Sequence, residues 1–168
     1  MKKLSIAIFI ILGIIATGCQ QREPIEVKPS KSQITDADKS EVYAIMKTIF
    51  IDQNIDKALN NSFKDLKTLK KIQVALETES LDETKELLIS QYMSLPVFDT
   101  RSEYLDKFQP DTIEVFEEDG SLVSTIAVDL NGDTYTTKYV FAQNERGEWY
   151  NTEDLPGLAR ELEIEIEE

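Results

Sequence analysis

The chain has 168 residues and a formal net charge of −14, with no histidine and a single cysteine. These absences exclude an imidazole base, a histidine metal ligand, catalytic pairs of histidine with serine or cysteine, and an internal disulfide. The acidic balance argues against a nucleic-acid partner, because nucleic-acid binding needs clustered cations that neutralise phosphates. Hydrophobic residues make up 41% of the chain, which is enough for the core of one domain.

The N-terminal segment has the pattern of an export signal. Lys2 and Lys3 precede an apolar stretch that covers residues 4–16. Thirteen residues in a helix span roughly 20 Å, which is short of the roughly 30 Å hydrocarbon core of a bilayer. The stretch therefore suits a signal peptide better than a transmembrane helix.

Cys19 follows this stretch directly and is preceded by the small residues Ala16, Thr17 and Gly18. The segment resembles the lipobox of bacterial lipoproteins, although Ala16 stands where that family usually has leucine. The resemblance implies cleavage after Gly18 and lipidation of Cys19, whose acyl chains would hold the protein on a membrane. We therefore expect an anchored protein in the cell membrane or outer membrane, facing away from the cytoplasm. An ordinary secretory signal and an uncleaved anchor are the alternatives.

The rest of the chain divides into a tether and one folded unit. We expect a signal peptide over residues 1–18, a lipidated cysteine and flexible tether over 19–39, and a single α+β domain over 40–168. The tether is polar, contains Pro24 and Pro29, and shows no apolar periodicity.

The first helix of this domain is predicted from helical spacing of apolar residues. Thr35 offers a capping side chain, and the apolar residues of 42–50 then recur every three or four positions. We expect this helix to continue into the upper fifties, where Asn60 and Asn61 interrupt it.

Two further helices are predicted from capping residues. Ser62-x-x-Asp65 has the form of a new helix start, and an apolar stripe continues from there to Leu76. Ser80-x-x-Glu83 has the spacing of a capping box and predicts a third helix, which Pro96 ends.

Beyond residue 110 the apolar period changes from helical to alternating. Turn signals at 118–120, 131–132 and 145–147 separate four short strands, and Asn-Gly is the strongest hairpin signal among them. The tail from Leu155 fits either a short helix or an edge strand. Helices followed by strands predict an α+β domain in which N-terminal helices pack on one face of an antiparallel meander of about four strands.

A weaker resemblance covers residues 36–152. Helices that lead into a meander whose last strand follows Gly147-x-Trp149 are similar to cystatin-like and nuclear-transport-factor-two-like cone domains. This resemblance implies a concave sheet face. A plain helix-on-sheet arrangement is the alternative.

Asp129-Leu130-Asn131-Gly132-Asp133 has the first ligand positions of a calcium loop. An EF-hand also needs glycine at position six and an acid at position twelve, where this chain has Thr134 and Val140. We therefore interpret the segment as a hairpin turn and expect no metal site.

Carboxylates are plentiful, but they occur in runs such as 117–119 and 163–168, which are typical of solvated surface. Glu114 and Asp129 fall within predicted strands, where they either face outward or line the mouth of a cone. No spacing assembles a catalytic site or a cofactor site, so we expect no catalytic, cofactor-binding or metal-binding residue and predict that the protein is not an enzyme. A buried acid in a deep pocket would be the sign of catalysis.

Aromatic residues and charge suggest what the domain binds. Tyr135, Tyr139, Phe141 and Trp149 form either core or the lining of an apolar ligand site. Residues 103–168 hold 18 acids and 4 bases, whereas residues 20–102 hold 14 acids and 12 bases. Five lysines gather in the second predicted helical region: Lys57, Lys64, Lys67, Lys70 and Lys71.

This distribution predicts a non-catalytic protein-interaction module whose acidic half binds an envelope protein partner. A small apolar ligand-binding lipoprotein is the alternative. The only other partner expected is the membrane, through the lipid on Cys19, on whose anionic surface the lysines would also be favourable.

Overall fold

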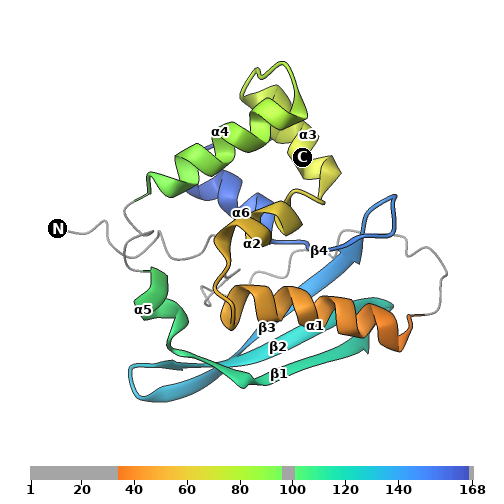
Figure 1. Ribbon diagram of the computed structural model, residues 1–168, viewed down its shortest axis with the longest axis vertical. Coiled ribbons are helices and arrows are strands. Elements are labelled where there is room, and N and C mark those ends of the chain that lie inside the picture. Colours follow the sequence, from red (N-terminus) through yellow and green to blue (C-terminus); the bar gives the residue numbers. More distant parts are fainter. Residues whose placement is uncertain (1–33, 96–100, 167–168) are drawn as a thin grey trace.

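The computed structural model describes residues 34–95 and 101–166, and Figure 1 shows their arrangement. The predicted lipidation site at Cys19 and residues 20–33 of the predicted tether lie outside the described residues, whereas the last predicted tether residues, 36–39, are the first turn of a helix. Six helices and four strands occur in the described part, in the order α1 (Asp36–Phe50), α2 (Ile55–Ser62), α3 (Leu66–Ala75), α4 (Leu81–Met93), α5 (Arg101–Leu105), β1 (Phe108–Glu118), β2 (Ser121–Leu130), β3 (Asp133–Gln143), β4 (Trp149–Asn151) and α6 (Asp154–Glu161). The predicted α+β class, with helices followed by a four-stranded meander, is confirmed.

The four strands form one antiparallel sheet in the order β1-β2-β3-β4. The turn between β2 and β3 has positive φ at both central residues, 54° at Asn131 and 91° at Gly132. Asn and Gly tolerate this conformation, and its twist matches that of the flanking strands. The predicted hairpin at this dipeptide is therefore confirmed.

The edge strand β1 contains an irregularity that its sequence explains. Its register against β2 shifts between Gln109 and Glu114, next to Pro110, which has no N–H to donate. The Thr112 hydroxyl compensates, because it accepts a hydrogen bond from the Ala127 N–H at 2.8 Å and donates to the Gln109 carbonyl at 2.7 Å. A side chain thus replaces the missing backbone pairing.

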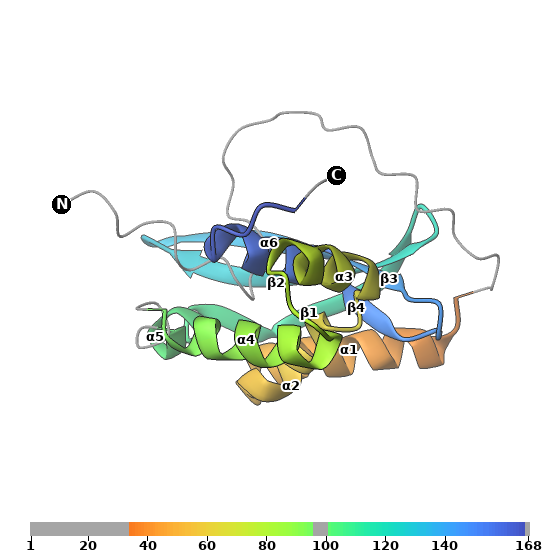
Figure 2. The same ribbon diagram turned by 90° about the horizontal axis from the view of Figure 1, so that it is seen from above.

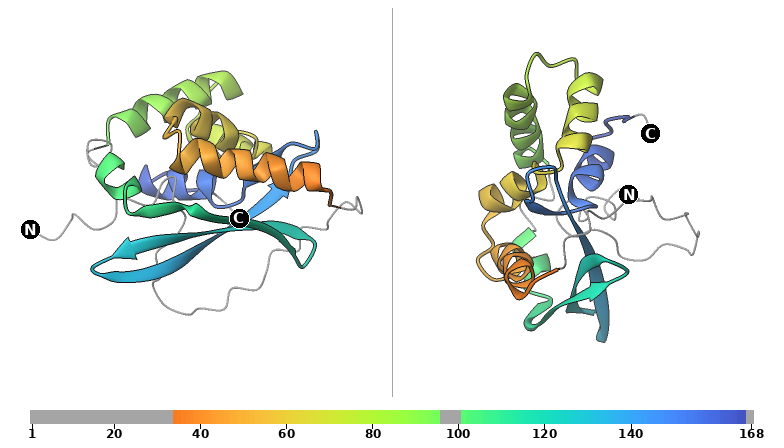
Figure 3. Two further views of the ribbon diagram at one scale, coloured as in Figure 1. Left: turned by 60° about the horizontal axis from the view of Figure 1, so that its bottom comes forward. Right: turned by 90° about the vertical axis from the view of Figure 1, so that its right-hand side faces the viewer.

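Helix α1 packs on the inner face of the sheet (Figure 3, left). Its buried residues follow helical spacing and face the buried residues of the strands. The Phe50 ring is the central contact, with centroid distances of 4.8 Å to Phe108 of β1 and 5.7 Å to Tyr139 of β3. Apolar burial between this helix and the sheet forms the main core.

Four of the remaining helices, α2, α3, α4 and α6, gather beyond the edge of the sheet that carries β4, whereas α5 leads into β1. Helix α2 contacts α1 and β4, α3 pairs with α4, and α6 packs against α3. Figures 2 and 3 show these four helices beside one another, with α1 alone lying along the strands. The predicted packing of helices on one face of the sheet is therefore seen mainly for α1.

The predicted boundary between the first two helices is wrong. Helix α1 ends at Phe50, and Asn54 begins a separate helix by accepting a hydrogen bond from the Lys57 N–H at 3.0 Å. Asn60 and Asn61 lie inside α2, and Asp65 rather than Ser62 caps α3. Asparagine favours caps but is tolerated within helices, so its position alone did not locate the break.

Other boundaries agree better with the sequence. Ser80 caps α4 and accepts a hydrogen bond from the Glu83 N–H at 3.1 Å, as predicted. The ambiguous tail forms helix α6, in which Leu155 and Leu158 are buried. Helix α5 and the beginning of β1 at Phe108 were not predicted.

One carboxylate joins the start of α1 to β4. Asp38 Oδ2 accepts hydrogen bonds from the Thr35 N–H at 2.8 Å and the Thr35 hydroxyl at 2.6 Å. Its Oδ1 accepts from the Trp149 indole N–H at 3.0 Å. Thr35 first and Trp149 second lower the pKa of Asp38, because both stabilise its charged form.

We expect Asp38→Ala to lower the free energy of unfolding by about 1–3 kcal/mol, because it removes a capping box and leaves the indole N–H of the buried Trp149 unpaired. Denaturant unfolding measures the change. Asp36→Ala is the matched control in the same helical turn, since the Asp36 side chain is fully exposed, and it should leave the free energy of unfolding nearly unchanged. Equal losses for the two variants would contradict the role of Asp38.

Candidate functional site

The predicted Asp129–Asp133 segment is a turn whose leading acid is already hydrogen-bonded. Asp129 accepts from the Thr134 hydroxyl at 2.6 Å and from the Gln109 amide at 2.8 Å. These two bonds, Thr134 first, lower the pKa of Asp129. No group of three or more acids or cysteines placed to hold a metal occurs within residues 34–95 and 101–166.

The four predicted aromatic residues separate in the structure. Tyr139, Phe141 and Trp149 are buried in the core, whereas Tyr135 is 53% exposed near the β2–β3 turn. Burial raises the pKa of Tyr139 well above its ordinary value, with a smaller contribution from nearby Asp154. Three of these rings are therefore packing residues beneath the helices.

The face of the sheet turned away from α1 carries an apolar row. Phe116 of β1, Val123 of β2 and Val140 of β3 are direct neighbours across the three strands. Phe116 and Val140 are each 37% exposed, while Val123 between them is buried. We call these three residues the outer row.

Charged residues lie beside the outer row. Glu114 and Glu118 on the edge strand β1 are exposed on the same face as Phe116, which places Glu114 outward rather than in the core, whereas Glu117 points to the opposite face. Glu118 pairs with Lys138 of β3, which is on the same face as Val140. The outer row is thus a small apolar centre with an acidic border, a combination found at interfaces between proteins.

A second feature is a buried polar cluster where β4, α2 and α6 meet. Asp154 is only 3% exposed and begins α6. Its Oδ1 accepts a hydrogen bond from the Asn151 amide at 2.7 Å, and its Oδ2 lies 3.1 Å from the Ser62 hydroxyl. Ser62 also lies 3.1 Å from the Ala58 carbonyl.

Two side chains donate hydrogen bonds to the Asp154 carboxyl, the Asn151 amide to Oδ1 and the Ser62 hydroxyl to Oδ2. Ser62 has a single proton and also lies within hydrogen-bond distance of the Ala58 carbonyl, so its support of a charged carboxylate is shared. Burial raises the pKa of Asp154 to about 8, against the hydrogen bonds that lower it. Asp154 is therefore mostly protonated at neutral pH.

A buried acid in a deep pocket would be a sign of catalysis, but both oxygens of the buried Asp154 face protein groups. It is not among the residues that line the pocket described below. Its arrangement suits a structural junction between the helices and the sheet. Sequence reasoning missed it, since Asp154 lies in an ordinary acidic stretch.

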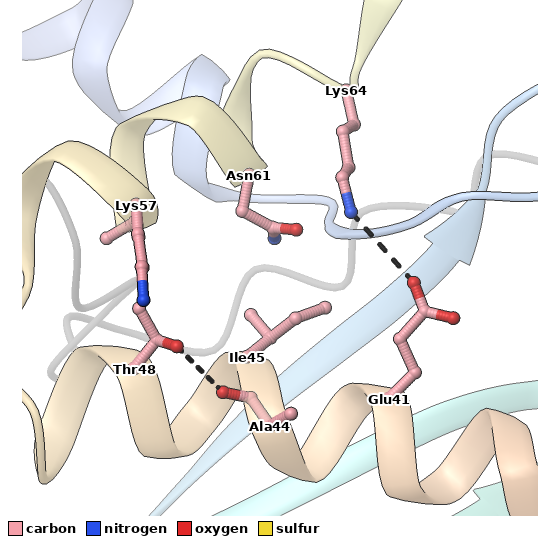
Figure 4. Close-up of a pocket in the computed structure, with 8 residues that line it drawn as sticks. Glu41, Ala44, Ile45, Thr48, Lys57, Asn61 and Lys64 are labelled. Atoms are coloured by element: carbon pink, nitrogen blue, oxygen red, sulfur yellow. Dashed lines mark hydrogen bonds and ion pairs between the residues drawn. The ribbon is translucent and has the colours of Figure 1, made fainter.

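A pocket of about 180 Å³ lies between α1 and α2. Figure 4 shows its lining, with Glu41, Ile45 and Thr48 on α1 facing Lys57, Asn61 and Lys64. Lys64 pairs with Glu41 at 3.9 Å. The other three lysines of the predicted cluster are on α3 and do not line this pocket.

Comparison with known proteins assigns no relative. No protein-family model matches the chain, and neither a curated protein nor a solved structure matches it. Within the described residues, every helix is too short or too polar to cross a bilayer.

We expect Asp154→Asn to gain stability relative to the native protein as pH rises from about 5 to about 8. Over this range the unfolded state has released the aspartate proton while the folded state keeps it, so the native protein loses up to about 1.4 kcal/mol per pH unit from this group. Asparagine imitates the protonated acid and has no proton to lose. Urea unfolding at several pH values measures the difference.

Asp129→Asn is the matched control, because the pKa of Asp129 is lowered and the group is ionised in both states across this range. Its effect on stability should not change with pH. A constant difference between Asp154→Asn and the native protein would show that Asp154 is ionised in the fold.

Proposed function

We propose that this protein is a lipid-anchored cell-envelope protein whose α+β domain is a non-catalytic interaction module, and that the outer row is its contact surface. The anchor rests on the resemblance of residues 16–19 to a lipobox. The contact surface rests on one observation, the apolar row in which the exposed Phe116 and Val140 flank the buried Val123.

The exposure of the outer row supports this role. Phe116 and Val140 flank Val123 and are each 37% exposed, and burial of this exposed apolar surface in a complex is favourable. The acids beside the row favour binding to a partner surface that is basic, and they disfavour binding to a partner surface that is neutral or acidic. The partner proposed here therefore has an apolar centre surrounded by lysine or arginine.

The acids of β1 also have a role that needs no partner. An edge strand exposes unpaired backbone groups, and charges along it prevent edge-to-edge aggregation. Glu114, Glu117 and Glu118 serve this purpose in either case, so the outer row rather than the acids carries the proposal.

The alternative, a lipoprotein that binds a small apolar ligand, needs an aromatic-lined cavity. The aromatic residues considered for it, Tyr139, Phe141 and Trp149, are buried in the core. Their packing favours the interaction module over the ligand-binding alternative.

We expect Cys19→Ser to abolish membrane anchoring. The native protein should partition into the detergent phase of Triton X-114 and carry a lipid mass on its N-terminal cysteine, whereas the variant should remain in the aqueous phase. Gln21→Ser, two residues further along, is the control and should behave as the native protein. Detergent partitioning of Cys19→Ser would contradict lipidation at this residue.

We expect a photo-crosslinking phenylalanine analogue at position 140 to capture an envelope protein in intact cells. The same analogue at position 74 is the control, because Val74 is 78% exposed on α3, outside the sheet. Capture at position 140 should decline in washed membranes as salt rises, since an exposed charge interaction is screened over roughly 10 Å at 0.1 M salt.

Two outcomes would contradict the interaction surface. One is equal capture of the same protein from positions 140 and 74, which would mean that the sheet face has no special role. The other is an absence of protein adducts combined with an apolar molecule that co-purifies with the domain, which would favour the ligand-binding alternative.

A further inference from the structure

The pocket between α1 and α2 has features that neither the fold nor the outer row requires. All of its lining residues belong to residues 41–48 and 57–64, so no strand contributes to it. It is therefore separate from the outer row, which lies on the opposite face of the sheet from α1.

Charge in the pocket has the opposite sign to the charge of the whole chain. Lys57 and Lys64 are two positive charges and Glu41 is one negative charge, which leaves a local charge of +1 in a chain of net charge −14. Glu41 already forms an ion pair with Lys64, with 3.9 Å between Glu41 Oε1 and Lys64 Nζ. Lys57 forms no ion pair within the described residues, so its ammonium group is available to a bound anion.

Asn61 supplies an independent indication of a ligand. It is only 8% exposed, and its side-chain nitrogen has no hydrogen-bond partner within the described residues. Figure 4 shows its amide extending from α2 toward α1, between the side chains of Lys57 and Lys64. A buried amide without a partner is costly, and rotation about its last torsion can turn its N–H₂ toward an acceptor in the pocket.

The remaining lining limits the size and character of the group. Ala44, Ile45 and Ala58 give the pocket an apolar part, and its volume of about 180 Å³ accommodates a few heavy atoms beyond a carboxylate. The Thr48 hydroxyl already donates to the Ala44 carbonyl at 2.9 Å and so offers only acceptor capacity. The donors available to a ligand are thus Lys57, Asn61 and, beside Glu41, Lys64.

We infer that this pocket binds one carboxylate group attached to a short aliphatic body. The carboxylate would lie between Lys57 and the Asn61 amide and would neutralise the local charge of +1, while its aliphatic carbons contact Ile45. A small free acid and the acidic side chain of a peptide share this chemistry. The inference is independent of the outer row.

Butyrate is the probe, and the full chain in detergent micelles with ¹⁵N labelling is the sample. We expect butyrate to shift the side-chain amide resonance of Asn61 in a saturable manner, with the weak affinity usual for so small a ligand. n-Butanol lacks the charge and n-butylammonium reverses it, so neither should shift that resonance. A short peptide with one glutamate tests the other source, and tighter binding than butyrate would assign the site to acidic side chains.

Lys57→Gln should weaken butyrate binding about tenfold, which is the loss expected for one charge-assisted hydrogen bond. Lys67→Gln removes the same charge from an exposed position of α3 outside the pocket and should leave binding unchanged. Equal weakening by both variants, or equal binding of butanol and butyrate, would overturn the inference. So would an Asn61 resonance that does not move while the amide spectrum shows a folded protein.

Discussion

The structure depends on the burial of one helix against one face of a twisted sheet. Helix α1 places its buried residues on β1, β2 and β3, and Phe50 contacts both Phe108 and Tyr139. A four-stranded meander with one apolar face cannot remain solvated, and α1 is the element that covers it. Everything else in the described chain is arranged around this pair of layers.

The short strand β4 connects this core to the other helices. It has three residues, Trp149–Asn151, and the side chains at both of its ends are hydrogen-bonded to the starts of helices. Trp149 donates to Asp38 at the start of α1, while Asn151 donates to Asp154 at the start of α6. Ser62 of α2 completes the second junction. Buried polar groups that are fully paired in this way specify a single arrangement of the surrounding elements.

A one-sided core leaves two different surfaces. The inner face is filled by α1, and on the outer face Phe116 and Val140 of the outer row remain exposed beside Glu114 and Glu118. The helical side holds a pocket whose local charge is positive. The uneven distribution of charge along the sequence therefore places acidic residues on the sheet and lysines on the helices.

The sequence by itself determined the α+β class, the meander and its Asn131–Gly132 turn, because alternation and turn preference are local properties of the backbone. It also determined the caps at Thr35 and Ser80. Tertiary structure decided where α1 ends, since the caps at Asn54 and Asp65 compete with equally suitable residues nearby and packing selects among them.

Only tertiary structure revealed the environment of Asp154, the pocket and the outer row. The neutral carboxyl of Asp154 depends on a position enclosed by packing, next to Ser62, which is 92 residues earlier in the chain. The pocket joins Lys57 and Asn61 to a face of α1 that local patterns cannot place opposite them. The sheet register likewise brings Phe116, Val123 and Val140 together. Contacts between distant segments are set by how layers pack, and that information is not present in any local stretch of sequence.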